Sequence, residues 1–218
     1  MPYPEGVKKW LPALILILMG ALYFWTRQRG MSVSEQVAHL PSGDGIFVIA
    51  DGSVVKKLAG DGNGEEAEYR DFVQKTGFDY RRDLDRLVAV IGEPHSYFVV
   101  SGRFDWPKIA AYSGNCVKGV CSMPASQPGK WISLMALGTG AVAIAVSPNQ
   151  LAVGEMEAAR KPLMEYSDVP FLVKGRGRHF ARWGLSGEEM VEVKLAGDAL
   201  ELKSGAVTRL LPLAKIFE

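Results

Sequence analysis

The stretch WISLMALGTGAVAIAV, residues 131–146, decides the fold, because it forms either a β-hairpin or a second membrane span. Two glycines interrupt its centre, and from residue 141 onward alanine alternates with valine or isoleucine. A period of two, with small side chains on one face and β-branched ones on the other, is typical of a strand buried on both sides. We therefore expect a hairpin that turns at residues 138–140.

A second hairpin is expected within EMVEVKLAGDALELKS, residues 189–204. Apolar and charged residues alternate on both sides of Gly197 and Asp198, which are typical turn residues. One face of this hairpin is therefore expected to be apolar and the other solvated. The apolar residues 210–217 that follow are expected to pack on the domain.

The order of the predicted elements indicates an α+β domain. A continuous apolar run at residues 45–51 predicts a buried strand. Residues 87–112 and 131–163 each predict two strands followed by a helix, so a β-β-α pattern occurs twice with little residue identity. We expect a mostly antiparallel sheet with helices packed on it, built around a duplicated β-β-α unit.

The N-terminal segment predicts a membrane anchor. Residues 10–25 carry no charge and would span roughly 24 Å as a helix, slightly less than a hydrocarbon core of about 30 Å. Trp10, Tyr23 and Trp25 stand at its ends, where interfacial aromatic residues are expected. The sequence that follows has neither a typical cleavage site nor a cysteine for lipid attachment, which favours an uncleaved anchor over a cleaved signal peptide.

These features predict three parts of the chain. Residues 1–29 form the anchor, residues 30–44 a short linker helix and residues 45–218 an extracytoplasmic α+β domain. The flanking lysines and arginines are balanced, so charge alone does not orient the anchor.

The two cysteines of the chain provide the orientation, since both lie in NCVKGVC, residues 115–121. A two-residue turn at Lys118 and Gly119 places Cys116 opposite Cys121 in a hairpin. These two cysteines would form a non-hydrogen-bonded pair. In such a pair the Cα atoms are about 4.5 Å apart, which is close enough for a disulfide. A disulfide indicates an oxidising compartment, so we expect the domain to be periplasmic and the anchor to cross the inner membrane once.

The composition excludes several function classes. Of 218 residues, 48% are hydrophobic and 22% charged, and the formal net charge of +1 gives no general attraction for nucleic acid. The three histidines lie far apart and begin no metal-binding motif, and no glycine-rich phosphate-binding loop occurs. We therefore expect no metal, no cofactor and no nucleic-acid partner.

One basic run is a candidate binding site. The segment VKGRGRHFARW, residues 173–183, contains Lys174, Arg176, Arg178 and Arg182 among aromatic residues. Such a run can hold anionic lipid headgroups or glycans. A glycine-rich turn with solvated arginines is the competing interpretation.

Three short motifs are similar to the signatures of penicillin-binding proteins and β-lactamases: SVVK at 53–56, KTG at 75–77 and SGN at 113–115. In that chemistry the lysine amine takes the proton of the serine hydroxyl, which would be Lys56 and Ser53. However, the motif order differs and the KTG ends a predicted helix instead of lying on a strand. We therefore expect no enzymatic activity and keep a serine-lysine envelope hydrolase as the alternative.

The segment EYRDFVQKTGFDYRRDLDRLVAVIG, residues 68–92, is followed by YFVVSGRFDWPKIAAY, residues 97–112. Together they resemble a family of uncharacterised bacterial proteins, through the pattern G-F-D-x-x-x-D-L-D from Gly77 and the motif G-R-F-D from Gly102. The resemblance covers roughly residues 40–165. It implies a single N-terminal span before an extracytoplasmic α+β domain, and it implies no activity and no catalytic residues.

The expected function is therefore that of a membrane-anchored envelope protein. Its domain is expected to act as a non-enzymatic interaction or assembly module, such as an accessory subunit of a membrane complex. The expected partners are the lipid bilayer, through residues 10–25, and other envelope or membrane proteins.

Overall fold

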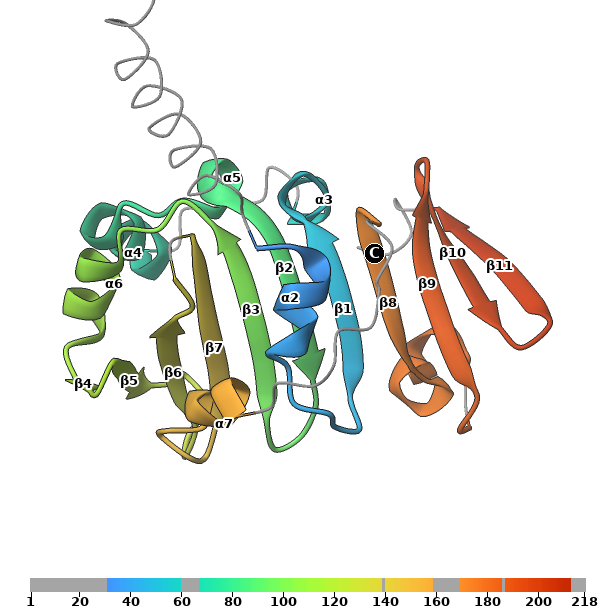
Figure 1. The fold of residues 1–218 in the computed structure, drawn as a ribbon. Helices are drawn as coiled ribbons and strands as arrows, with labels where there is room; N and C mark the ends of the chain where they lie inside the picture. Colours follow the sequence, from blue (N-terminus) through green and yellow to red (C-terminus); the bar gives the residue numbers. More distant parts are fainter. Residues whose placement is uncertain (1–30, 60–66, 139, 159–168, 186, 213–218) are drawn as a thin grey trace, which may run out of the picture. The chain divides into compact units, whose positions relative to one another are not determined.

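A computed structural model of the chain describes residues 31–59, 67–138, 140–158, 169–185 and 187–212. These residues form an α+β unit built on one large antiparallel sheet (Figure 1). Residues 31–218 group as one compact unit, distinct from residues 1–30. The predicted anchor, including Trp10, Tyr23 and Trp25, lies outside the described residues, and among the residues described no helix is long and apolar enough to cross a membrane.

The sheet of the described residues has 11 strands in the order β11-β10-β9-β8-β1-β2-β3-β7-β6-β5-β4. Every neighbouring pair is antiparallel. The strands are β1 Ile46–Asp51, β2 Leu84–Ile91, β3 Ser96–Gly102, β4 Cys116–Val117, β5 Val120–Pro124, β6 Trp131–Ala136, β7 Ala141–Ser147, β8 Phe171–Arg176, β9 Met190–Ala196, β10 Ala199–Ser204 and β11 Val207–Pro212.

Short helices connect and cover these strands, and residues suited to helix ends mark several of their boundaries. Asp105 caps α6, whose first turn contains Pro107, and Gly77 follows α4 in the left-handed conformation that glycine favours. The helices are α2 Val33–Ala38, α3 Gly52–Ala59, α4 Ala67–Thr76, α5 Tyr80–Asp83, α6 Trp106–Ser113, α7 Val153–Ala158 and the 3₁₀ segment η1 Gly177–Trp183.

The main core lies on one face of the sheet, called here the α2 face because α2 and α7 cover it (Figure 1). One row of apolar side chains crosses this face from strand to strand. Ile49, Val88, Val99 and Ala143 are all fully buried members of this row. Burying such a continuous apolar row is the main favourable contribution to folding.

The segment predicted as a linker helix belongs to this core. Ser32 and Glu35 form the capping box that starts α2. Val33 and Leu40, whose spacing brings them to the same side, are buried against the sheet. The folded unit thus begins at residue 31, earlier than the expected boundary at residue 45, because the apolar face of the short helix finds its partner in the sheet.

The expected hairpin at residues 131–146 is confirmed as β6 and β7. Ala143 and Ala145 face the α2 core, and Val142 and Ile144 belong to a cluster on the opposite face. The opposite face is called the α6 face, because α6 packs on it there. The small side chains of β7 therefore lie under α7, and the branched ones lie on the α6 face.

The β-β-α pattern recurs in element order, as β2-β3-α6 and β6-β7-α7, but its geometry does not repeat. β3 and β7 are antiparallel neighbours, so a two-fold axis normal to the sheet would relate the two hairpins. That axis would keep both helices on one face, whereas α6 and α7 cover opposite faces. The expected duplicated unit therefore has no support in the placement of its helices.

The C-terminal hairpin has one apolar and one charged face, as expected. Its apolar side chains pack on the α6 face with α3 and η1, and its charged side chains lie on the α2 face beyond the helices. The apolar set is Val191, Val193, Leu200 and Leu202, and the charged set is Glu192, Lys194, Glu201 and Lys203.

Candidate functional site

The strand β11 forms an open edge of the sheet. The hairpin that joins β10 to β11 closes with the pair Ser204 and Val207 around a two-residue turn, and such a closing pair is hydrogen-bonded. Because the pattern alternates, Arg209 and Leu211 also bond to β10. The backbone groups of Thr208 and Leu210 therefore point away from the sheet.

The outward backbone groups of β11 have no partner within the described chain. On the side that faces away from β10, Thr208 and Leu210 make no hydrogen bond to any described residue. The strand is six residues long, and its Val207 and Leu210 side chains are 54% and 64% exposed. A long edge with exposed apolar side chains is a template for another strand.

The opposite edge of the sheet is short, and the strand behind it is blocked. Its last strand, β4, is only two residues long. Behind it, the outward N–H of Ser122 in β5 donates to the carbonyl oxygen of Asn115 at 2.9 Å, and the next outward position is Pro124, which has no N–H. A short strand, a paired donor and a proline are recognised means of preventing edge-to-edge association.

The disulfide locks this closed edge, in the register that the sequence predicts. Cys116 lies directly opposite Cys121, and a disulfide joins the two residues. The turn residues Lys118 and Gly119 have φ angles of 50° and 84°, as the mirror-image turn of a tight hairpin requires. The prediction of a cross-strand bond is confirmed.

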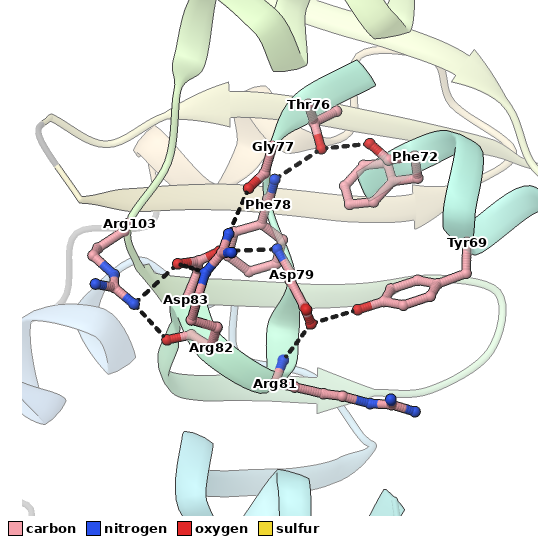
Figure 2. Close-up of polar contacts among 10 residues, drawn as sticks. All are labelled: Tyr69, Phe72, Thr76, Gly77, Phe78, Asp79, Arg81, Arg82, Asp83 and Arg103. Atoms are coloured by element: carbon pink, nitrogen blue, oxygen red, sulfur yellow. Dashed lines mark hydrogen bonds and ion pairs between the residues drawn. The ribbon is translucent and has the colours of Figure 1, made fainter. Parts of the chain in front are cut away.

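A polar cluster at the start of β2 fixes the loops that lead to α6 (Figure 2). Asp83 is 5% exposed and forms ion pairs with Arg82 at 2.7 Å and with Arg103 at 3.0 Å. The hydrogen bond from Arg82 is the main reason that the pKa of Asp83 is lowered to about 2. Arg103 also donates to the carbonyl of Arg82 at 2.7 Å, so both arginines act within the chain.

Asp79 organises the other side of this cluster. Its carboxylate accepts a hydrogen bond from the Arg81 backbone N–H at 2.9 Å, which caps α5, and another from the Tyr69 hydroxyl at 2.8 Å. Burial, and then this hydrogen bond to a carboxylate, raises the pKa of Tyr69 to about 12. Tyr69 therefore remains a neutral donor and is not poised for proton transfer.

The two motifs that carry the family resemblance meet in this cluster. Gly77 ends α4, Asp79 starts α5 and Asp83 receives Arg103 of the motif G-R-F-D. A Cβ atom at Gly102 would lie 2.2 Å from the carbonyl oxygen of Asp83, so only glycine fits there. The shared pattern therefore corresponds to local packing and capping.

The basic run is paired with acidic residues. Arg176 and Arg178 both form ion pairs with Glu188 and with Asp44, which balances their charge. Lys174 lies on the α2 face and pairs with Glu192 at 2.8 Å. The expected anion site stays a prediction, because an anion would have to displace the acids from Lys174, Arg176 and Arg178. The side chain of Arg182, its fourth expected member, lies outside the described residues.

The serine-lysine motif has no catalytic neighbourhood in the described chain. Ser53 and Lys56 are exposed on α3, with no hydrogen bond between them. Lys75 of the KTG motif pairs with Asp71 at 2.8 Å, and Ser113 of the SGN motif donates to Ala110. Among the described residues no group of three or more metal-ligating side chains comes together.

A groove of about 490 Å³ runs beside α6. Phe104, Trp106, Gly138 and Gly140 contribute to its lining. Its one acidic side chain, Asp105, already caps α6 and pairs with Lys108 at 2.8 Å. Among the described lining residues, the groove therefore gathers no free charged side chain that would orient a ligand.

Sequence reasoning missed β11. The expectation that residues 210–217 pack on the domain holds only in part, because Leu211 is half-buried and Leu210 is exposed, while residues 213–217 lie outside the described range. The turn signal at Gly205, where φ is 56°, was available in the sequence.

No protein-family model matches the chain, and no curated protein matches its sequence. Among solved structures, the chain is similar to three crystal forms of TP0453. Form III is 9% identical, with a TM-score of 0.48, and the match covers 85% of this chain and 86% of that one. Form I is 10% identical, with a TM-score of 0.46, covering 85% and 84%. Form IV is 8% identical, with a TM-score of 0.46, covering 77% and 80%. This likeness assigns neither a family nor a function.

Proposed function

We propose that the chain is a membrane-anchored envelope protein whose extracytoplasmic domain is a non-enzymatic interaction module, with β11 as its docking edge. The observation that carries this proposal is the contrast between the edges. One edge has a paired donor, a proline and a disulfide. The other presents backbone groups that no described residue pairs, beside an apolar residue that is 64% exposed.

Two further features support the location. A disulfide is typical of an oxidising compartment, which fits an extracytoplasmic domain. The uncharged residues 10–25 fit an anchor in the inner membrane, and the family resemblance implies the same plan.

An extended strand is the type of partner that such an edge accepts. Main-chain hydrogen bonds supply the affinity in strand addition, and alternate side chains supply specificity. Here the alternate side chains are Thr208 and Leu210 on the α2 face and Arg209 on the α6 face. An accessory subunit that adds its edge to another envelope protein would bind in this way.

The test is photo-crosslinking in native membranes. A photoreactive residue replaces Leu210 in one variant and Val117 in the other; Val117 is 58% exposed at the closed edge and is the matched control. We expect at least about five-fold more protein adduct from position 210, because only that edge can extend the sheet. Equal yields from both positions, or no adduct from position 210, would remove the proposal.

A further inference from the structure

Resting on this proposed function, we propose that the strand added to β11 is β11 of a second copy of this chain. The two strands would run antiparallel, related by a two-fold axis that lies between Leu210 and Leu210 of the copy. This pairing makes one continuous sheet from two domains. The side chains and backbone groups of β11 select this pairing.

The faces of the sheet limit the possible registers. A two-fold axis normal to a sheet preserves its faces, so residues directly opposite each other must point to the same face. Thr208, Leu210 and Pro212 lie on the α2 face, and Arg209 and Leu211 lie on the α6 face. The axis must therefore lie midway between one residue of β11 and the same residue of the copy. It cannot lie level with the peptide bond between two residues.

The outward hydrogen-bonding groups select among these registers. With the axis at Leu210, this residue exchanges both backbone hydrogen bonds with its own copy. Each outward Thr208 N–H then donates to the carbonyl oxygen of the partner's Pro212. Pro212 has no N–H, so it leaves no donor unpaired in return. Every outward donor of β11 is satisfied. An axis at Val207, Thr208, Leu211 or Pro212 leaves outward donors of the strand without such partners.

Charge excludes the remaining register. An axis at Arg209 would also satisfy the outward donors, but it would place Arg209 directly opposite Arg209 of the copy. That pair occupies a non-hydrogen-bonded site, where side chains are closest and like charges are destabilising. With the axis at Leu210, Arg209 stands opposite the partner's Leu211 instead.

The apolar layer of the domain continues across this junction. Leu211 packs with Leu200 and Leu202 in the apolar cluster on the α6 face. A hollow of about 110 Å³, lined in part by Leu202, Val207 and Arg209, opens beside the position where the partner's Leu211 would arrive. On the α2 face, the exposed Leu210 side chain would cover its own copy. Self-pairing therefore buries the apolar groups that the open edge exposes.

The experiment is cysteine crosslinking of the full-length chain in its own membranes. The two natural cysteines are bonded to each other, so each introduced cysteine is the one free thiol in the described chain. The variants are Leu210→Cys, Arg209→Cys and Thr208→Cys. In the proposed register the two Cα atoms of residue 210 are about 5.5 Å apart, which is within disulfide range.

Under mild oxidation we expect a disulfide-linked dimer from Leu210→Cys, at about ten-fold higher yield than from the two neighbouring positions. Equal dimer yields from all three positions would indicate random collision and would overturn self-pairing. A crosslink from position 210 to a protein of another mass would overturn it too, while leaving the docking edge of the proposed function intact. No crosslink of any kind at position 210 would count against both.

Discussion

The two edges of one sheet are built on opposite principles. At the β4–β5 edge, every outward N–H of β5 is paired or replaced by proline, and a disulfide holds the terminal hairpin. At the β11 edge, six residues end the sheet without a cover among the described residues. Because unpaired edges promote association, a protein that closes one edge so thoroughly is expected to use the other.

The largest expected effect comes from closing the open edge. Leu210→Pro removes an outward N–H but leaves the bonds to β10, which come from the neighbouring residues. We expect association, measured by sedimentation of the detergent-solubilised full-length protein, to fall at least about ten-fold, with little change in melting temperature. A second comparison uses lysine variants at two exposed leucines. Leu210→Lys is compared with Leu151→Lys, whose leucine is 56% exposed and lies outside β11. Equal association of these two lysine variants would contradict the role of β11.

A smaller effect is expected from opening the closed edge. The double variant Cys116→Ser with Cys121→Ser removes a short crosslink, which lowers the free energy of unfolding by about 2 kcal/mol. For a domain of this size the melting temperature should fall by about 4–8 °C, measured by calorimetry.

Ser122 and Pro124 still block β5 in that variant, so no new crosslink at position 117 is expected. Wild-type protein treated with a reductant is the control and should show the same shift. Association through the β4–β5 edge after removal of the disulfide would mean that the bond alone keeps this edge closed.

The helices beside the closed edge depend on Asp83. Since the pKa of Asp83 is lowered to about 2 from 3.8, its ion pairs stabilise the fold above pH 4. This stabilisation, about 2 kcal/mol, is lost as the pH falls through 2. Asp83→Asn should lose the same amount at pH 7 by chemical denaturation, and the difference between variant and wild type should vanish near pH 2.

Hydrogen exchange in Asp83→Asn should increase in α6 and β5, which lie beyond Arg103, and stay unchanged in β11. The ion pairs with Arg82 and Arg103 make this prediction specific. If Asp83→Asn keeps the full unfolding free energy of the wild type at pH 7, the ion pairs of Asp83 do not stabilise the fold.

The smallest expected effect is a gain in stability at Gln36. It distinguishes association of the native protein from association of unfolded protein. Gln36 is fully buried in α2, and neither polar atom of its amide group has a hydrogen-bond partner in the part of the chain that the structure describes. Gln36→Met keeps the shape and removes two unsatisfied groups, so we expect a gain of about 1 kcal/mol in unfolding free energy. Association through β11 should not change. Weaker association in this more stable variant would indicate that unfolded protein, not the native edge, is what associates.

Local patterns predicted the parts of the fold that local chemistry decides. The alternation around Ala143 and Ala145 predicted a strand buried on both faces, and the turn at Lys118 and Gly119 predicted the disulfide register. Both depend on residues close together in the sequence.

The order of the strands could not be predicted in this way. β1 lies between β2 and β8, so which strand ends the sheet depends on pairings across more than a hundred residues of the chain. The candidate site is an edge, and an edge is defined by that order alone. The core role of α2 was missed for the same reason, because Val33 and Leu40 find their partners only in the assembled sheet.

The most direct measurement is site-resolved amide hydrogen exchange in β11, comparing membrane-resident protein with protein diluted below its association range. The amides of Thr208 and Leu210 point outward, and those of Arg209 and Leu211 bond to β10. We predict that association slows exchange at Thr208 and Leu210 by at least about ten-fold and leaves Arg209 and Leu211 unchanged. Equal exchange at Thr208 and Leu210 in both samples would contradict the docking edge.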